Sequence, residues 1–321
     1  MEVSDRNIKI WSTIGSRATF GLAAFELGKK IDNLIVLTCD VSTSAGLDRY
    51  RKTYTNKYLD LGIAEQNMIG VAAGLSSEGY NVVTTTFAPF QTIRCCEQIK
   101  VNVGYMKQKV CMVGLASGLA LGNLGFTHCC IEDIGVLRSI PGIKIISPAD
   151  SLETIKAFEA ALKSNQSTYL RLTGTSNNPI IYKKDYNFEI GKSIKLLNGK
   201  DITIFSAGSI LSECLKVTEI LKKEGIAASV VNMHTIKPID KEAIDEACNS
   251  KMIISVEEHN VFGGLGTSIS EYLSSLKSHP KLLTIGIDDY YSKGGSYNFL
   301  KEKHGLSANM IVSNILKNFK N

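Results

Sequence analysis

The sequence predicts an α/β protein with two domains: a larger domain on a parallel sheet, followed by a smaller α/β domain. The chain has 321 residues, a length that favours two domains over one. Short apolar runs alternate with helical patterns along it, and continuous apolar strands of this kind indicate a parallel sheet covered by helices on both faces. Hydrophobic residues make up 44% of the chain, enough for ordinary globular cores.

Five apolar runs predict the strands of the first domain. They are residues 34–39, 82–87, 110–115, 143–146 and 169–172. Between them, residues 17–27 predict a helix that stops at Gly28, and residues 93–103 predict another. Asp150, with Glu153 three residues later, predicts the capped start of a helix over residues 151–163.

A turn-rich stretch closes the first domain, which is predicted to span residues 1–178. Residues 179–200 are polar and irregular in pattern, and they predict a linker. A second alternating series then predicts a C-terminal domain over residues 201–321. Its strands are expected at residues 202–205, 229–233, 253–256 and 282–285.

Charge and cysteine content exclude several classes of protein. Lys plus Arg is 36 and Asp plus Glu is 31, and the small excess is scattered, so no nucleic-acid surface is expected. The cysteines include the vicinal pairs 95–96 and 129–130 but no Cys-x-x-Cys, so no metal site is expected. A charged, polar N-terminus without a signal sequence, together with reduced thiols, predicts a cytoplasmic protein.

One segment has the length of a membrane span. Residues 110–131 contain no Asp, Glu, Lys or Arg. Four glycines and the polar side chains of Asn123, Thr127 and His128 interrupt this run, however. A strand that leads into a glycine-rich loop is therefore favoured, and no membrane association is expected.

A single carboxylate stands at the head of a small, apolar helical run. Glu65 precedes residues 68–75, which are all Gly, Ala or larger apolar residues. Burying a carboxylate is costly unless something uses it, and desolvation would raise its pKa. That property suits an acid that hydrogen-bonds a ring nitrogen. The alternative is an acid that complements the helix dipole, and spacing alone leaves both interpretations open.

Other candidate residues follow the predicted strands. Ligands of parallel sheets bind beyond the carboxyl ends of the strands, which here lead to Asp40, to residues 87–90 and 116–128, and to Thr173. The rings of Phe87 and Phe90 either stack on a flat heterocycle or fill the core.

The glycine-rich loop over residues 121–128 carries a further candidate. Its backbone N–H groups could approach an anion or oxyanion, and a helix is expected to begin near His128. His128 either takes part in proton movement and hydrogen bonding to a substrate or has a structural role.

Several motifs, in order along nearly the whole chain, resemble the transketolase family of thiamine-diphosphate enzymes. The resemblance is in particular to the C-terminal half of these enzymes made as a separate subunit. It implies a pyrimidine-binding domain with the thiamine-diphosphate-binding fold, then a transketolase C-terminal domain. The motifs are LGIAEQ at 61–66, TFAPF at 86–90, Arg94 with EQI at 97–99, GFTH at 125–128, IEDI at 131–134, RSIPG at 138–142, TIKPID at 235–240, and EEH at 257–259 with Gly263 and Gly264.

The resemblance assigns cofactor contacts to five positions. Glu65 corresponds to the glutamate that hydrogen-bonds the aminopyrimidine nitrogen and so promotes loss of the thiazolium C2 proton. Phe90 corresponds to the ring that stacks on the pyrimidine, and Phe87 to its neighbour in the pocket. Asp40 and Ile93 fall near the cofactor.

Substrate contacts are implied for three residues. His128 corresponds to a histidine that contacts the carbonyl or hydroxyl of the substrate, which makes it the second catalytic candidate beside Glu65. Arg17 and Ser44 fall where transketolases hold a sugar phosphate.

A motif that the family needs is missing. No Gly-Asp-Gly followed by a distant Asn holds diphosphate and metal in this chain. The resemblance therefore implies an N-terminal partner subunit that carries most contacts to Mg²⁺ or Ca²⁺, thiamine diphosphate shared between the chains, and an α2β2 assembly.

Four departures from the family pattern bear on the substrate. Leu124 replaces an Asp, Ala116 a phosphate-contacting His, Gly174 lies near a phosphate Arg, and Cys129 replaces a Gln. The acceptor is thus expected to differ from pentose phosphates, for example a modified or nucleotide-linked sugar. The expected activity is transfer of a two-carbon ketol unit from a ketose or ketose phosphate to an aldose. The alternatives are a subunit like deoxyxylulose-phosphate synthase or the E1-beta chain of a 2-oxo-acid dehydrogenase, and a non-catalytic regulatory subunit.

Overall fold

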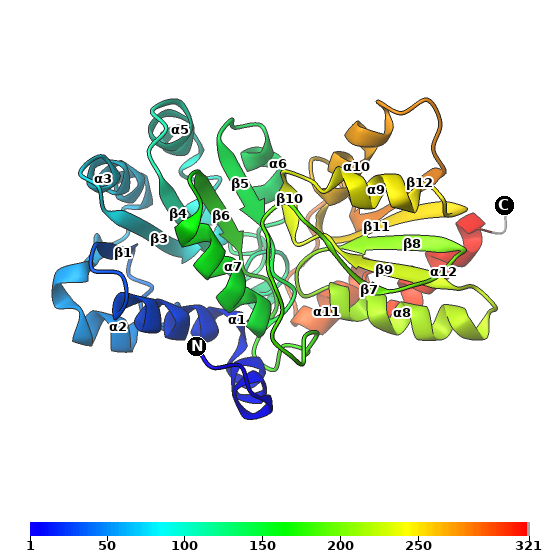
Figure 1. Cartoon of the computed structure of the whole chain (residues 1–321), viewed down its shortest axis with the longest axis horizontal. Coiled ribbons are helices and arrows are strands. Elements are labelled where there is room, and N and C mark those ends of the chain that lie inside the picture. Colours follow the sequence, from blue (N-terminus) through cyan, green and yellow to red (C-terminus); the bar gives the residue numbers. More distant parts are fainter. Residues whose placement is uncertain (320–321) are drawn as a thin grey trace.

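The computed structural model describes residues 1–319 and consists of two α/β units side by side (Figure 1). The first unit has a seven-stranded sheet with the order β10-β5-β6-β4-β3-β1-β2. The second has a five-stranded sheet with the order β12-β11-β8-β9-β7. Each sheet is parallel except for one antiparallel strand at an edge, β10 in the first and β7 in the second. The predicted α/β fold class is confirmed.

All nine predicted strands are present, and three further strands were not expected. The first sheet contains β1 (Leu34–Thr38), β2 (Tyr58–Asp60), β3 (Asn81–Phe87), β4 (Val110–Leu115), β5 (Ile143–Ile146), β6 (Ser167–Arg171) and β10 (Thr235–Lys237). The second contains β7 (Ile194–Leu197), β8 (Ile202–Ser206), β9 (Ala228–Asn232), β11 (Met252–Asn260) and β12 (Lys281–Ile287).

The strand β7 corrects the expectation that residues 179–200 are irregular throughout. This strand pairs antiparallel with β9, and partly buried and exposed residues alternate along it. Such alternation is typical of an antiparallel strand with one solvated face. The strand β10 lies far along the sequence, yet it pairs with β5 of the first sheet, so the two units are joined by backbone hydrogen bonds as well as by packing.

The helices cover both faces of each sheet. The first unit contains α1 (Asp5–Gly28), α2 (Asp48–Thr53), η1 (Thr55–Lys57), α3 (Glu65–Ser77), α4 (Ala88–Gln91), α5 (Cys96–Gln98), η2 (Ile99–Tyr105), η3 (Gly122–Leu124), α6 (Asp133–Arg138) and α7 (Ser151–Lys163). The second contains α8 (Leu211–Lys223), α9 (Lys241–Ala247), α10 (Leu265–Leu273), α11 (Tyr297–Lys303) and α12 (Ala308–Phe319). Helices α1 and α7 pack together, with the rings of Phe20 and Phe158 5.0 Å apart, on the face opposite α3.

Local signals explain the start of α7 and the division of α1. The Asp150 side chain accepts a hydrogen bond from the Glu153 N–H, which confirms the predicted cap of α7. Gly15, with φ of 80°, divides α1, so the predicted helix over residues 17–27 forms its second part. A Cβ at Gly15 would lie 2.8 Å from the carbonyl oxygen of Thr175, so that close approach also requires glycine.

Two helix predictions were wrong. Residues 93–103 do not form one α-helix: a turn and the short α5 lead into η2, a π-helix over Ile99–Tyr105. No helix begins near His128, which lies in a turn, and the next helix α6 starts at Asp133. The helix after the glycine-rich loop thus begins five residues later than expected.

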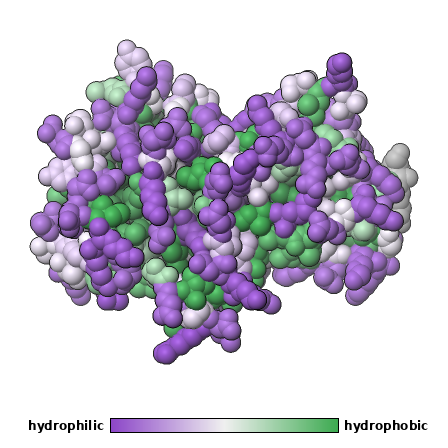
Figure 2. All heavy atoms as spheres, in the orientation of Figure 1, coloured by the Kyte–Doolittle hydropathy of each residue, from purple (hydrophilic) through white to green (hydrophobic). Residues whose placement is uncertain are grey.

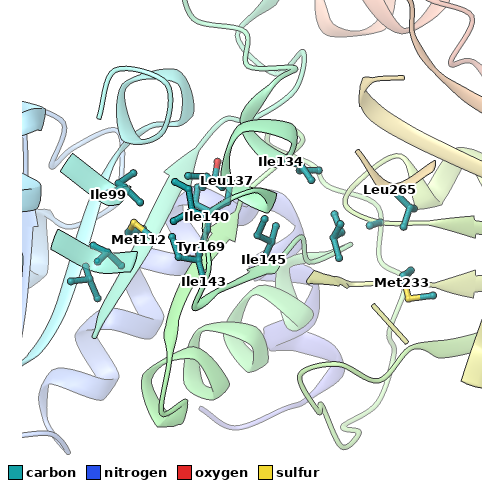
Figure 3. Close-up of a cluster of buried hydrophobic side chains, with 14 of the residues drawn as sticks. Ile99, Met112, Ile134, Leu137, Ile140, Ile143, Ile145, Tyr169, Met233 and Leu265 are labelled. Carbon is teal, nitrogen blue, oxygen red and sulfur yellow. The ribbon is translucent and has the colours of Figure 1, made fainter. Parts of the chain in front are cut away.

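A shared core joins the two units. One cluster of buried side chains runs from Ile99 and Met112 in the first unit to Met233 and Leu265 in the second (Figure 3). Hydrophilic side chains cover most of the drawn face, with small hydrophobic areas between them (Figure 2). Residues 110–131 form β4 and the loop after it, as expected, and no helix within residues 1–319 is long and apolar enough to cross a membrane.

Buried polar groups also connect the units. His259 of β11 lies fully buried, its Nδ1 donates to the Asn260 carbonyl oxygen at 2.7 Å, and its Nε2 accepts the Gly135 N–H at 3.3 Å. This arrangement requires a neutral imidazole. Burial lowers the pKa of His259 to about 4, although the nearby Asp133 carboxylate acts in the opposite direction.

The buried imidazole predicts loss of stability in acid. The unfolded chain takes up a proton at His259 near pH 6.5 and the folded chain only near pH 4, so the contribution of this group falls as the pH drops through that window. We expect the slope of unfolding free energy against pH to exceed that of a His259→Gln variant by at most about 1.4 kcal/mol per pH unit. Urea titrations between pH 6.5 and 4 measure it.

The contribution of Glu257, whose pKa burial raises to about 7, has the opposite sign and is present in both proteins. Parallel pH profiles for the wild type and the variant would contradict the prediction.

Candidate functional site

The carboxyl ends of β1, β3, β4 and β6 lie at one edge of the first sheet because these strands are parallel. The residues that follow two of them have unusual backbones: φ is 57° at Asp40 and 52° at Ala116. Positive φ is uncommon for residues other than glycine, and it is concentrated at functional sites. Of the candidates named from the sequence, four lie in turns or loops: Asp40, Ser44, Ile93 and His128. Phe87 ends β3 and Phe90 lies on α4, whereas Glu65 and Arg17 lie on α3 and α1.

Asp60 holds the end of β1 and the loop that precedes Glu65 through hydrogen bonds. Its carboxylate accepts the N–H groups of Asp40 at 2.9 Å and Gly62 at 3.1 Å, and the hydroxyl of Thr38 at 3.1 Å. Burial alone would raise the pKa of Asp60, but these hydrogen bonds lower it. Asp40 therefore lies at the end of β1 through its backbone contact to Asp60, while its own side chain is exposed.

Glu65 is the first residue of α3, and its side chain is only 4% exposed. Arg94 donates a hydrogen bond from Nη1 to the Glu65 Oε2 at 2.8 Å, and the two form an ion pair. The guanidinium carbon of Arg94 also lies 4.0 Å from the ring centroid of Phe90. Sequence reasoning missed this pairing because 29 positions separate the two residues and no local periodicity links them.

Three rings meet around Phe90, the ring that Arg94 contacts. The ring centroids of Phe90 and His128 are 5.3 Å apart, those of Phe87 and His128 6.0 Å, and those of Phe87 and Phe90 6.4 Å. All three are partly exposed, although Phe87 also packs against the core. The Thr127 hydroxyl lies 3.0 Å from His128 Nδ1. These rings are close to perpendicular to one another, so a flat ring could stack on one aromatic face and meet the edges of the others.

Arg17 and Ser44 line a second part of the site, a pocket of about 310 Å³. Its other lining residues come from the Gly15 bend, the loop after β1 and the turn after β6; they are Ile14, Gly15, Ser16, Ala18, Thr43, Gly46, Gly174, Thr175 and Ser176. Burial lowers the pKa of Arg17, and no acidic partner contacts its guanidinium within residues 1–319. A half-buried cation without a counter-ion favours binding of an anion in this pocket.

Gly174, which departs from the family pattern, is fixed by its surroundings. Its φ is 79°, and an added Cβ would lie 2.4 Å from Asn178 Oδ1. A larger side chain there would displace the Asn178 side chain and adopt a strained backbone conformation. The other departures differ in exposure: Ala116 is buried, whereas Leu124 is 56% exposed on η3.

Ile93 lies one position before Arg94 and is 44% exposed, and Ile63, in the loop before α3, is 77% exposed. Both apolar residues are close in sequence to the Glu65–Arg94 pair. Exposed apolar side chains of this size are compatible with a surface that meets a partner.

The residues present fit the ring end of thiamine diphosphate, since a buried carboxyl and an aromatic face lie together. Within residues 1–319 no group of three or more His, Cys, Asp or Glu side chains is arranged to hold a metal ion. Each cysteine of that part of the chain is a free thiol.

Comparison with known proteins shows the family to which the chain belongs. Residues 12–178 match the family model described as "Transketolase, pyrimidine binding domain", and residues 191–311 match "Transketolase, C-terminal domain". A "putative transketolase C-terminal section" of Methanocaldococcus jannaschii is 36% identical over 95% of this chain and 96% of its own length.

Two further relatives are named as a transketolase subunit and as a split-gene transketolase. The "6-deoxy-6-sulfo-D-fructose transketolase subunit SqwH" of a Clostridium species is 35% identical over 92% of each chain. Among solved structures, a "split gene transketolase, inactive beta4 tetramer" superposes with a TM-score of 0.86 at 33% identity and covers 96% of this chain and 98% of that one.

Proposed function

The chain belongs to the transketolase family, and from that membership we propose that it is the pyrimidine-binding subunit of a split transketolase. The activity is transfer of a two-carbon ketol unit from a ketose or ketose phosphate to an aldose-type acceptor. The observation that carries this proposal is the buried Glu65 carboxyl, which Arg94 links to the aromatic face of Phe90. Thiamine diphosphate, when bound, supplies the nucleophilic carbon that carries the ketol unit.

The residues of this chain have separate tasks in the proposal. Glu65 holds a proton at the pyrimidine nitrogen, Phe90 stacks on the ring, and Phe87 and Ile93 exclude water around it. Asp40, at the end of β1, lies at the border of the same site.

Substrate contacts fall to the remaining candidates. His128, whose ring touches both phenylalanine rings, hydrogen-bonds the substrate carbonyl or hydroxyl and helps to move its proton. Arg17 and Ser44 hold the anionic end of the sugar in their shared pocket.

An N-terminal partner subunit completes the site in this proposal. It holds the diphosphate and Mg²⁺ or Ca²⁺, and two copies of each chain form an α2β2 enzyme. In support, the chain matches relatives of its own length that are named as subunits or sections of transketolases, and a similar chain is named as an inactive tetramer by itself. The proposed location is the cytoplasm, in keeping with free thiols throughout residues 1–319.

The isolated chain is expected to bind thiamine diphosphate only weakly, with a Kd at least about a hundredfold above that of the complex, because most charged contacts to the cofactor lie on the partner. Isothermal titration calorimetry of the chain alone, of the partner alone and of the mixture with Mg²⁺ gives the comparison. Tight binding by the chain alone would refute the need for a partner.

Arg17→Leu is expected to raise the KM for an anionic sugar by about tenfold or more while kcat changes little, since the lost ion pair forms in both the bound substrate and the transition state. Initial rates with a phosphorylated and a neutral sugar test this. Arg6→Leu, an exposed position on α1, is the control. Equal effects on both sugars would remove Arg17 from the anion site.

The substrate of one relative, 6-deoxy-6-sulfo-D-fructose, is also an anionic sugar, and a substrate of that kind is compatible with an unpaired Arg17. The alternative within enzymes is decarboxylation of a 2-oxo acid, as in deoxyxylulose-phosphate synthase or 2-oxo-acid dehydrogenases. Release of carbon dioxide from pyruvate by the reconstituted pair would favour that alternative over ketol transfer. A non-catalytic regulatory subunit is the alternative from another class, and it requires that loss of Glu65 leave activity unchanged.

A further inference from the structure

Arg94 makes two contacts at the centre of the site that no part of the proposed reaction uses. Its Nη1 donates to the Glu65 carboxylate at 2.8 Å, and its guanidinium carbon lies 4.0 Å from the centroid of the Phe90 ring. The Glu65 side chain is 4% exposed, whereas that of Arg94 is 41% exposed. Arg94 therefore covers the carboxylate on a side that opens to solvent.

These two contacts are the same two that the proposed function assigns to the aminopyrimidine ring. A guanidinium is planar, stacks on aromatic faces and donates hydrogen bonds at its edge, as a protonated heterocycle does. Glu65 and Phe90 cannot offer the same face and the same oxygen to both groups at once. We propose that the Arg94 side chain occupies the pyrimidine site before the cofactor binds and must swing away for the ring to enter.

This inference rests on the proposed function and adds a step to it. Before loading, Arg94 neutralises a carboxylate that would otherwise be buried without a partner, an expensive state. The backbone of Arg94 is held in place, because Gln66 Nε2 donates to its carbonyl oxygen at 3.1 Å. Only the side chain needs to move, and its exposed side leaves it a route into water.

Removal of Arg94 has a different effect on cofactor affinity if Arg94 competes with the ring than if it binds the cofactor. If Arg94 competes with the ring, its removal destabilises the unloaded chain and leaves the loaded complex nearly unchanged. Cofactor affinity then rises when Arg94 is lost, by on the order of tenfold. The gain depends in part on the charge of Glu65, so it becomes smaller when Glu65 is replaced by glutamine, which can accept a hydrogen bond but carries no charge.

The experiment uses the full chain in complex with its diphosphate-binding partner and titrates it with thiamine diphosphate and Mg²⁺ by calorimetry. The wild type, Arg94→Met, Glu65→Gln and the double variant form a double-mutant cycle. Thermal unfolding of each free chain is measured in parallel. Arg49→Met is the matched control, because Arg49 is exposed and stacks on Phe25 at 4.1 Å, away from Glu65.

We expect tighter binding for Arg94→Met and a lower unfolding temperature of its free chain. Both effects should be smaller in the Glu65→Gln background and absent for Arg49→Met. Weaker or unchanged binding by Arg94→Met would overturn the inference while leaving the proposed function intact, since Arg94 would then belong to the loaded site or lie outside it. Absence of any thiamine-diphosphate binding by the wild-type complex would instead refute the proposed function.

Discussion

Glu65→Gln is expected to lower the kcat of the reconstituted two-chain enzyme by about 10²- to 10⁴-fold, the usual contribution of a proton-transferring side chain. A glutamine has nearly the same shape but cannot hold or share the proton that the pyrimidine nitrogen needs. The side chain is 4% exposed, so water cannot replace the lost carboxyl. Steady-state rates with a ketose donor and an aldose acceptor measure the effect.

The fold should survive this change, because the amide oxygen can still accept the hydrogen bond from Arg94 that the carboxylate accepts now. Glu78→Gln provides the matched control: Glu78 is exposed at the other end of α3 and should leave kcat unchanged. Cofactor affinity is measured for both variants, so that a loss of binding is not mistaken for a loss of chemistry. Near wild-type rates for the Glu65→Gln variant would show that the carboxyl is structural and that the catalytic assignment fails.

The sequence predicted the strands well where hydrophobicity was continuous. Both β4 and β8 are buried along their whole length. Strands that are buried on both faces are mostly apolar, so each is recognisable in the sequence as a continuous hydrophobic run. Helix α7 was equally clear, since the Asp150 cap marks its first residue. The short strands β2 and β10 have three residues each, fewer than any period can reveal.

For the site, the sequence could name residues but not their contacts. Positions after parallel strands must share an edge, and this rule placed Phe87 and His128 close to each other, 6.0 Å between ring centroids. The contact of Arg94 with Glu65 depends on how a turn after α4 meets the start of α3, which no local pattern contains. The π-helix η2, which follows this turn, shows how far the backbone there departs from the expected α-helix.

A second contact of this type holds the two units together. Arg171 at the end of β6 is 2% exposed, and its Nε lies 2.9 and 3.0 Å from the two oxygens of Asp133, which is fully buried. Its Nη2 donates to the carbonyl oxygens of Glu258 at 2.9 Å and Cys130 at 3.3 Å. Tyr169 donates to the same carboxylate at 2.7 Å. One guanidinium therefore joins β6, α6, β11 of the second unit and the loop that follows His128.

Arg171→Met is expected to lower the free energy of unfolding by about 3–5 kcal/mol, because it leaves a buried carboxylate with one remaining donor and two carbonyl groups without theirs. Urea denaturation followed by circular dichroism measures the change. The double variant with Asp133→Leu should recover part of the loss, since removing both charges also removes the uncompensated one. Lys192→Met, which breaks an exposed ion pair with Glu242, should have little effect. An Arg171→Met variant as stable as the wild type would contradict this prediction. Water would then have to reach the Asp133 carboxylate, which is fully buried in this structure.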